Sequence, residues 1–197
     1  MTITAKEIAE LRAKTGIGMM ECKKALEEAE GNEDKAIEIL RKRGIAKAAK
    51  RAERETKNGV IESYVHGNGK IGVLVEVLAE TDFVAQNDEF KAFAHDVALH
   101  VAAMNPKYIA KENVPAETVE KEKALFVEEV AALGKPVEIA EKIAEGKLNK
   151  FLEEICLLDQ PFVKDPSKTI TVLLNDLTLK IGEKIVINRF CRFEIGE

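Results

Sequence analysis

Apolar residues repeat at helical spacing through the first part of the chain, between clear start and stop signals. Thr4 is placed to cap a helix, and Glu7 follows three residues later, the spacing of a capping box. Gly16, Gly31 and Gly44 are expected to end three successive helices. Their inward positions are Ile8 and Leu11, then Met19, Cys22, Leu26 and Ala29, then Ala36, Ile37 and Leu40. This pattern predicts a compact three-helix module over residues 1–44.

The next segment, residues 45–58, is nearly free of large apolar residues and predicts a basic linker helix. Its basic side chains are Lys47, Lys50, Arg51, Arg54 and Lys57. A helix that is polar all round is usually a solvated connector, which is the interpretation we favour. The alternative is that its basic face contacts an acidic partner surface, such as ribosomal RNA.

The remainder, residues 59–197, predicts a core of strands and helices. Residues 60–66 and 71–78 alternate as strands, and Gly67-Asn68-Gly69-Lys70 between them is a strong hairpin signal. A last strand is expected over residues 184–195, antiparallel to the hairpin, because one hairpin alone is marginally stable. Helices are expected over 87–104, from Pro115 to a break at 134–136, and over 137–145, 147–156 and 167–181, with 158–166 an extended or looped connection. The predicted fold class is α+β, with a small three-stranded antiparallel sheet packed with helices.

Gly67, Gly69 and Gly72 match the dinucleotide-binding pattern G-x-G-x-x-G letter for letter. That motif needs a helix after the glycines, whose N-terminus holds the pyrophosphate. Here a second predicted strand follows at once. We therefore assign these glycines to the hairpin turn and expect no direct nucleotide binding.

Charge, cysteine content and hydropathy argue against a nucleic-acid-binding, disulfide-stabilised, secreted or membrane-spanning protein. The 197 residues include 30 Lys and Arg against 35 Asp and Glu, a net charge of −5, so bulk capture of nucleic acid is not expected. The three cysteines are scattered and form no C-x-x-C pair, which indicates a reduced, cytoplasmic protein. The first ten residues lack the apolar region of a secretory signal, and no apolar run is long enough to span a membrane.

Catalytic and metal-binding patterns are missing from the sequence. His95 and His100 are five apart and do not share a helix face, and His66 is isolated. There is no H-x-x-x-H pair, nucleophile elbow or phosphate-binding loop. We therefore expect no metal and no cofactor, and an enzyme is the weakest class of function.

One segment is unusual for a simple domain. Thr81-Asp82-Phe83-Val84 places a large aromatic residue after an acid at a predicted strand-to-helix corner. A projecting Phe83 would suit a protein interface, because aromatic residues dominate interface energy. The alternative, favoured by pattern alone, is that Phe83 folds back under the following helix and Asp82 merely caps it.

Several motifs together resemble the bacterial elongation factor Ts family in its short form. They lie at residues 11–26, 36–44, 72–77, 80–87, 103–106 and 189–194, in family order and across essentially the whole chain. The resemblance implies a guanine-nucleotide exchange factor for elongation factor Tu, with a ubiquitin-associated-like head that docks on the GTPase. It also implies that Asp82 and Phe83, framed by Thr81 and Val84, insert into the partner and dislocate its Mg²⁺.

Further expectations follow from this resemblance. Gly16, Met19 and Met20 are candidates for partner docking on the head. Short relatives pair through the core sheet, so we expect a homodimer, with Cys191 on the last strand as a candidate contact; the alternative is a buried free thiol. The second functional hypothesis is a non-exchanging adaptor of the translation machinery, and an enzyme is the third.

Overall fold

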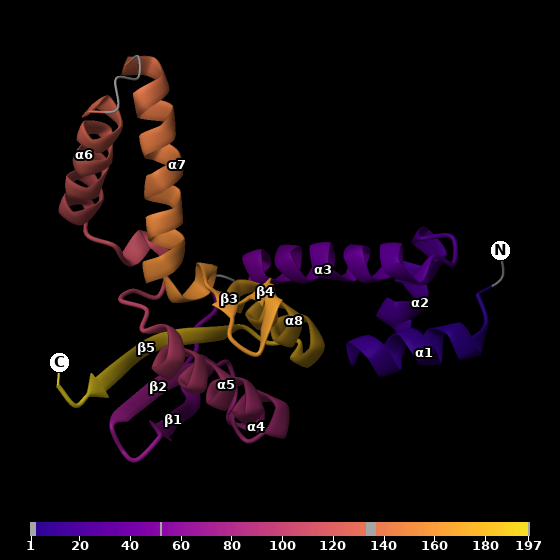
Figure 1. Cartoon of the computed structure of the whole chain (residues 1–197). Coiled ribbons are helices and arrows are strands. Elements are labelled where there is room, and N and C mark those ends of the chain that lie inside the picture. Colours follow the sequence, from indigo (N-terminus) through magenta and orange to yellow (C-terminus); the bar gives the residue numbers. More distant parts are fainter. Residues whose placement is uncertain (1–2, 52, 133–136, 197) are drawn as a thin grey trace. The chain divides into compact units, whose positions relative to one another are not determined.

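The computed structural model describes residues 3–51, 53–132 and 137–196 of the chain (Figure 1). Its elements, in chain order, are α1 (Ala5–Thr15), α2 (Met19–Glu28), α3 (Glu33–Lys50), β1 (Asn58–His66), β2 (Ile71–Ala79), α4 (Asp82–Ala85), α5 (Asp88–Met104), the 3₁₀ turn η1 (Lys111–Asn113), α6 (Ala116–Ala132), α7 (Val137–Ile155), the 3₁₀ turn η2 (Leu157–Asp159), β3 (Pro161–Phe162), β4 (Asp165–Thr169), α8 (Ile170–Ile181) and β5 (Ile185–Glu194).

The α+β fold class is confirmed. β1, β2 and β5 form a three-stranded antiparallel sheet in the order β1-β2-β5, so the predicted hairpin and last strand are both present. Gly67 and Gly69 adopt φ values of 61° and 78° in the turn between β1 and β2. These left-handed conformations favour glycine, and a strand follows them directly. Gly67 and Gly69 therefore serve the turn, as predicted, whereas Gly72, the third glycine of the G-x-G-x-x-G match, lies in β2.

Contacts within the chain fall into two compact units, each assembled from segments far apart in sequence. The first comprises Met1–Glu62, Glu76–Ala94 and Val172–Ile187, and the second Ser63–Val75, His95–Thr171 and Asn188–Glu197. The domain boundaries drawn from the sequence, at residues 44 and 58, stay predictions. Each unit is described separately below.

In the first unit, α1, α2 and α3 pack around one apolar core. The capping box at Thr4 is present: the Thr4 hydroxyl accepts from the Glu7 amide, and the Glu7 carboxylate accepts from the Thr4 amide. The core contains the predicted inward residues except Met19, which is 46% exposed, so its inward placement is wrong. It also contains a residue from far along the chain that was not predicted, Leu179 of α8. A residue from the C-terminal part of the chain thus completes the core of the N-terminal helices.

The predicted helix end at Gly44 is wrong. α3 continues to Lys50, and Gly44 is buried where a Cβ atom would lie 3.4 Å from Leu179. A Cβ atom at this distance would make ordinary van der Waals contact with α8, and the alanines and lysines that follow Gly44 favour a continued helix. The linker helix expected over residues 45–58 is therefore wrong beyond Lys50: residues 53–57 are not helical, and Asn58 begins β1. In that segment Arg54 bonds Glu80 and Lys57 pairs with Glu55.

In the second unit, α6 and α7 lie side by side as a helical hairpin (Figure 1). Leu148 and Leu152 of α7 are buried in an apolar cluster that includes Val119 and Phe126 of α6. The sequence predicted two helices separated near Gly146, but α7 is continuous through it. The buried stripe on both sides of Gly146 outweighs the roughly 1 kcal/mol that glycine costs within a helix. The predicted break at 134–136 lies outside the described residues.

A short second sheet was missed by the sequence analysis. β3 pairs antiparallel with β4 where a loop was expected, and α8 begins at Ile170 rather than at Ser167. The Ile170 amide donates to the Gln160 carbonyl across the base of this hairpin. Strands this short show no alternation, so periodicity could not reveal them.

A buried polar network also lies in the second unit. The ring of His100 on α5 accepts from the Val163 amide at Nδ1 (3.2 Å), and its Nε2 lies 2.9 Å from the Gln160 side-chain oxygen. These partners assign the neutral form protonated at Nε2. Burial lowers the pKa of His100 from its ordinary 6.5, while the hydrogen bond to Gln160 partly opposes the shift.

We expect this histidine to make the protein sensitive to mild acid. Because the folded state holds His100 neutral, its stabilising contribution is complete above the unfolded-state pKa of 6.5 and declines as the pH falls from there towards the lower folded-state pKa. Urea unfolding at about pH 7.5 and about pH 5.5 measures the decline. His100→Gln should flatten it, whereas His95→Gln, on the exposed side of the same helix, should not. An equal pH dependence in both variants would contradict the prediction.

Candidate partner-binding corner at residues 80–85

The chain turns sharply where β2 ends and α4 begins, within the first unit. Thr81 is the N-cap residue of α4 in an extended conformation, with φ −125° and ψ 157°. α4 is a single helical turn, closed by hydrogen bonds from the Ala85 amide to the Thr81 carbonyl and from the Gln86 amide to the Asp82 carbonyl. A helix this short is not stable alone and depends on what surrounds it.

The first two side chains of α4 face solvent and the last two are buried. Phe83 is 91% exposed, whereas Val84 and Ala85 are 9% and 3% exposed. Phe83 therefore does not fold back under the helix, which was the interpretation favoured by pattern alone. Burying a phenylalanine is worth about 1.5–3 kcal/mol, which this corner forgoes in the free chain. The burial remains available to a partner.

A carboxylate from the other end of the chain holds Thr81. Glu183, in the turn between α8 and β5, accepts the Thr81 amide at 3.0 Å and the Thr81 hydroxyl at 2.8 Å. The hydroxyl therefore makes no capping bond to α4 itself. Both oxygens of one carboxylate are used, which fixes the backbone and the side chain of Thr81 together.

Glu80 adds a second set of contacts beneath the corner. Its carboxylate accepts from the Lys184 amide (2.6 Å) and from Arg54 (2.9 Å), and its carbonyl accepts from the Asn58 side chain (2.8 Å). Partial burial acts to raise the pKa of Glu80, but these hydrogen bonds and the charge of Arg54 outweigh it, and the pKa lies below its ordinary value. The carboxylate is thus held charged as part of the support.

Asp82 faces solvent and does not cap the helix. Its carboxylate accepts from the Gln86 side chain at 2.7 Å, one turn later. The corner therefore presents an aromatic ring beside a negative charge, on a backbone fixed from both sides. Such a surface can bind a partner, and it contains no group placed for bond-making chemistry.

The docking candidates on the head lie at the junction of α1 and α2. Met19 and Met20 are 46% and 66% exposed at the start of α2. Gly16 ends α1 with φ 69°, and a Cβ atom there would lie 2.3 Å from the Lys180 side chain. The left-handed conformation explains the glycine, whereas the end of the flexible Lys180 side chain could move aside, so Gly16 ends α1 rather than presenting a side chain.

Cys191 lies in an exposed apolar region of the sheet within the second unit. It is an exposed free cysteine, so the alternative of a buried thiol is wrong. Phe193, Ile195, Val65 and Leu74 are also exposed, and along β2 the exposed Leu74 alternates with the buried Val73 and Val75. We call the five exposed residues the outer sheet patch: Val65, Leu74, Cys191, Phe193 and Ile195.

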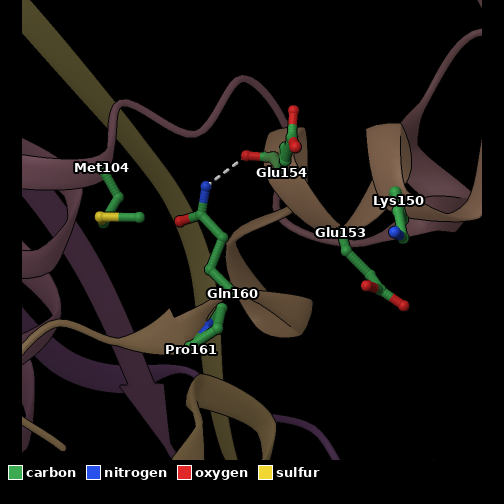
Figure 2. Close-up of a pocket in the computed structure, with 6 residues that line it drawn as sticks. All are labelled: Met104, Lys150, Glu153, Glu154, Gln160 and Pro161. Atoms are coloured by element: carbon green, nitrogen blue, oxygen red, sulfur yellow. Dashed lines mark hydrogen bonds between the residues drawn. The ribbon is translucent and has the colours of Figure 1, made fainter. Parts of the chain in front are cut away.

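A pocket of about 480 Å³ lies elsewhere in the second unit, lined by Met104, Lys150, Glu153, Glu154, Gln160 and Pro161 (Figure 2). In Figure 2 the Gln160 amide points to the Glu154 carbonyl, to which it donates a hydrogen bond. The lining includes no histidine, cysteine or hydroxyl. Within the described ranges, no three acidic, histidine or cysteine side chains are grouped to hold a metal, and no helix is both long and apolar enough to cross a bilayer.

The corner was predictable from the sequence, but its supports were not. Glu183 lies 102 positions from its partner Thr81, and Arg54 lies 26 positions from its partner Glu80; nothing in their neighbourhoods marks either contact. Arg54 appeared only as one charge of a basic segment. Contacts at such separations depend on the tertiary fold.

Comparisons with known proteins match one and the same family over nearly the whole chain. A family model described as "Elongation factor TS" matches residues 3–197. Similar curated proteins, each named elongation factor Ts, come from Alkaliphilus oremlandii (57% identity, 100% of this chain and 91% of the relative), Acetivibrio thermocellus (56%, 99% and 91%) and Thermosipho melanesiensis (56%, 99% and 100%).

The burial pattern of α4 predicts that two neighbouring substitutions change the free energy of unfolding by very different amounts. Phe83→Ala should change the free energy of unfolding by less than about 0.5 kcal/mol, because the exposed ring supports nothing in the free chain. Val84→Ala should lower it by about 2 kcal/mol, because it leaves a gap beneath the corner. Urea unfolding of both variants tests this, and a loss for Phe83→Ala as large as that for Val84→Ala would contradict it.

Proposed function

The chain belongs to the elongation factor Ts family and acts as a translation elongation factor, and from this premise we propose that it promotes guanine-nucleotide exchange on elongation factor Tu. The observation that supports this most is the 91% exposure of Phe83 on a corner fixed by Glu183, Arg54 and Lys184. An aromatic ring on a rigid support is well suited to insert into a partner.

In the proposed mechanism, Phe83 and Asp82 insert between elements of the GTPase that hold its Mg²⁺. Thr81 and Val84 frame them, the first held by Glu183 and the second buried in this chain. Mg²⁺ requires near-ideal octahedral oxygen geometry and bridges phosphate to protein. A small displacement of its supports therefore weakens GDP binding strongly, and no covalent step, cofactor or direct contact with the nucleotide is needed.

Thermodynamic linkage sets the requirement on this chain. It must bind the nucleotide-free GTPase more tightly than the GDP-bound form, and GDP must weaken its binding by the same factor. If the Phe83 ring is buried by the nucleotide-free GTPase but not by the GDP-bound form, the burial supplies this difference in binding free energy. We place this reaction in the cytoplasm.

The head supplies affinity in this proposal. Met19 and Met20 present two flexible apolar side chains at the start of α2, and methionine adapts readily to an uneven partner surface. Gly16 ends α1 with a left-handed backbone and so lets the chain turn into α2. Docking and release are then carried by different residues of one unit.

We further propose that two copies of the chain associate through the outer sheet patch. Contiguous exposed apolar residues on a sheet commonly mark an interface. Cys191 lies within the patch and would be buried by association, as a contact rather than as a disulfide in a reducing compartment.

The exchange proposal predicts that Phe83→Ala slows GDP release at saturating factor by about tenfold or more, the effect of losing an interface hot spot. Stopped-flow release of a fluorescent GDP analogue from elongation factor Tu measures the rate. Ile45→Ala, at an exposed apolar position of α3, is the matched control.

The double substitution Met19→Ala, Met20→Ala should instead weaken docking. A higher concentration of this chain would then be needed for half-maximal stimulation of GDP release. If Phe83→Ala still binds the GTPase but leaves the release rate unchanged, the exchange mechanism is wrong and the chain is a non-exchanging adaptor.

The association proposal predicts that Phe193→Asp shifts the chain to the monomer, because it places a charge within the apolar patch. Sedimentation equilibrium at several protein concentrations measures the shift. Cys191→Ser should remain associated, since packing rather than a disulfide holds the copies. A wild-type chain that is monomeric at high concentration would contradict the proposal.

A further inference from the structure

The end of α8 and the turn that joins it to β5 contact three parts of the first unit within a few residues. Leu179 belongs to the core of the N-terminal helices, and Lys180 lies against Gly16 and forms an ion pair with Glu89 of α5. Gly182 then adopts φ 86° and reverses the chain. Glu183 and Lys184 follow directly and bond Thr81 and Glu80.

From these contacts we infer that Glu183 is the positioning residue for the Phe83 corner. Its carboxylate bonds Thr81, the residue from which α4 starts, and acts on Phe83 through that residue. This inference rests on the proposed function for its consequence in exchange, but the positioning itself is a property of the free chain.

The geometry explains why the corner needs such a residue. α4 has four residues, too few to form a stable helix, and its N-cap residue makes no side-chain capping bond. The carboxylate of Glu183 bonds the Thr81 amide and hydroxyl instead, which fixes the residue from which α4 starts. Without it, Val84 and Ala85 still anchor the far side of α4, but the entry to the helix is released.

Fixing the entry matters because a mobile ring must be ordered when it binds. Side-chain and loop ordering opposes association, and a preorganised corner has met that requirement before the partner arrives. Loss of Glu183 should therefore slow release from the saturated complex more than it weakens docking through Met19 and Met20.

The chain contains no tryptophan, so Phe83→Trp creates a single fluorescent reporter on the corner itself. In this background, Glu183→Ala should lower the steady-state anisotropy of the introduced tryptophan, with the thermal transition retained. Glu183→Gln should preserve the anisotropy, because its carbonyl accepts the Thr81 amide and its amide donates to the Thr81 hydroxyl. Glu129→Ala, which removes the exposed partner of Lys147, is the control.

Measurements of GDP release, made on variants that keep the native Phe83 rather than the tryptophan reporter, complete the test. Glu183→Ala should slow GDP release at saturation by about tenfold, the effect expected from losing hydrogen bonds to a charged group. Glu183→Gln should restore most of the rate.

Unchanged anisotropy of the reporter in a folded Glu183→Ala chain overturns the inference. If Glu183→Ala does not fold, Thr81→Val is measured in its place. This variant removes only the hydroxyl bond to Glu183, so we expect a smaller loss of anisotropy. An unchanged anisotropy in Thr81→Val would overturn the inference as well. A different result would reject only the proposed function: Glu183→Ala lowers the anisotropy of the reporter, but Phe83→Ala leaves the rate of GDP release unchanged. That result supports the positioning role of Glu183 and rejects the exchange mechanism, so failure of the inference and failure of the proposed function are distinguishable.

Discussion

The two hydrogen bonds from Thr81 to the Glu183 carboxylate join the end of β2 to the start of β5, and the presentation of Phe83 depends on them. An exposed aromatic ring on a loose loop would adopt many orientations, and a partner would have to order it. Here the short α4 is fixed at its entry by Glu183 and at its exit by the burial of Val84 and Ala85. The corner is therefore rigid where it meets the fold and exposed only at the ring.

The same constraint links the N-terminal helices to the corner. Leu179 completes their core, and Gly44 is a glycine at the place where α3 and α8 approach closely. Four residues after Leu179 the chain reaches Glu183. The N-terminal helices and the corner are thus both held by one short stretch of α8 and its following turn, although the residues involved span most of the sequence.

Local patterns were sufficient for much of this structure and insufficient for its supports. The capping box at Thr4, the glycine turn between β1 and β2 and the apolar stripe of α5 are determined by neighbouring residues, and each was predictable. The helix end at Gly146 was predicted wrongly because burial on both sides of that glycine outweighs its intrinsic preference, and the end at Gly44 because the alanines and lysines that follow it favour a continued helix. The direction of Phe83 was ambiguous because α4 is a single turn, too short to show a period. The bonds of Glu183 lie beyond any local pattern.

A corner of this kind suits a protein that changes another protein's conformation without chemistry. Stabilising one state of a partner requires only that the ring gain more burial in that state than in the other, and the difference in binding free energy is then the whole driving force. A ring already buried in its own chain would have nothing to gain, and a ring on a mobile loop would lose part of the gain to ordering. An exposed Phe83 on an immobile Thr81 avoids both losses, which is why the support beneath the corner matters as much as the residue that it presents.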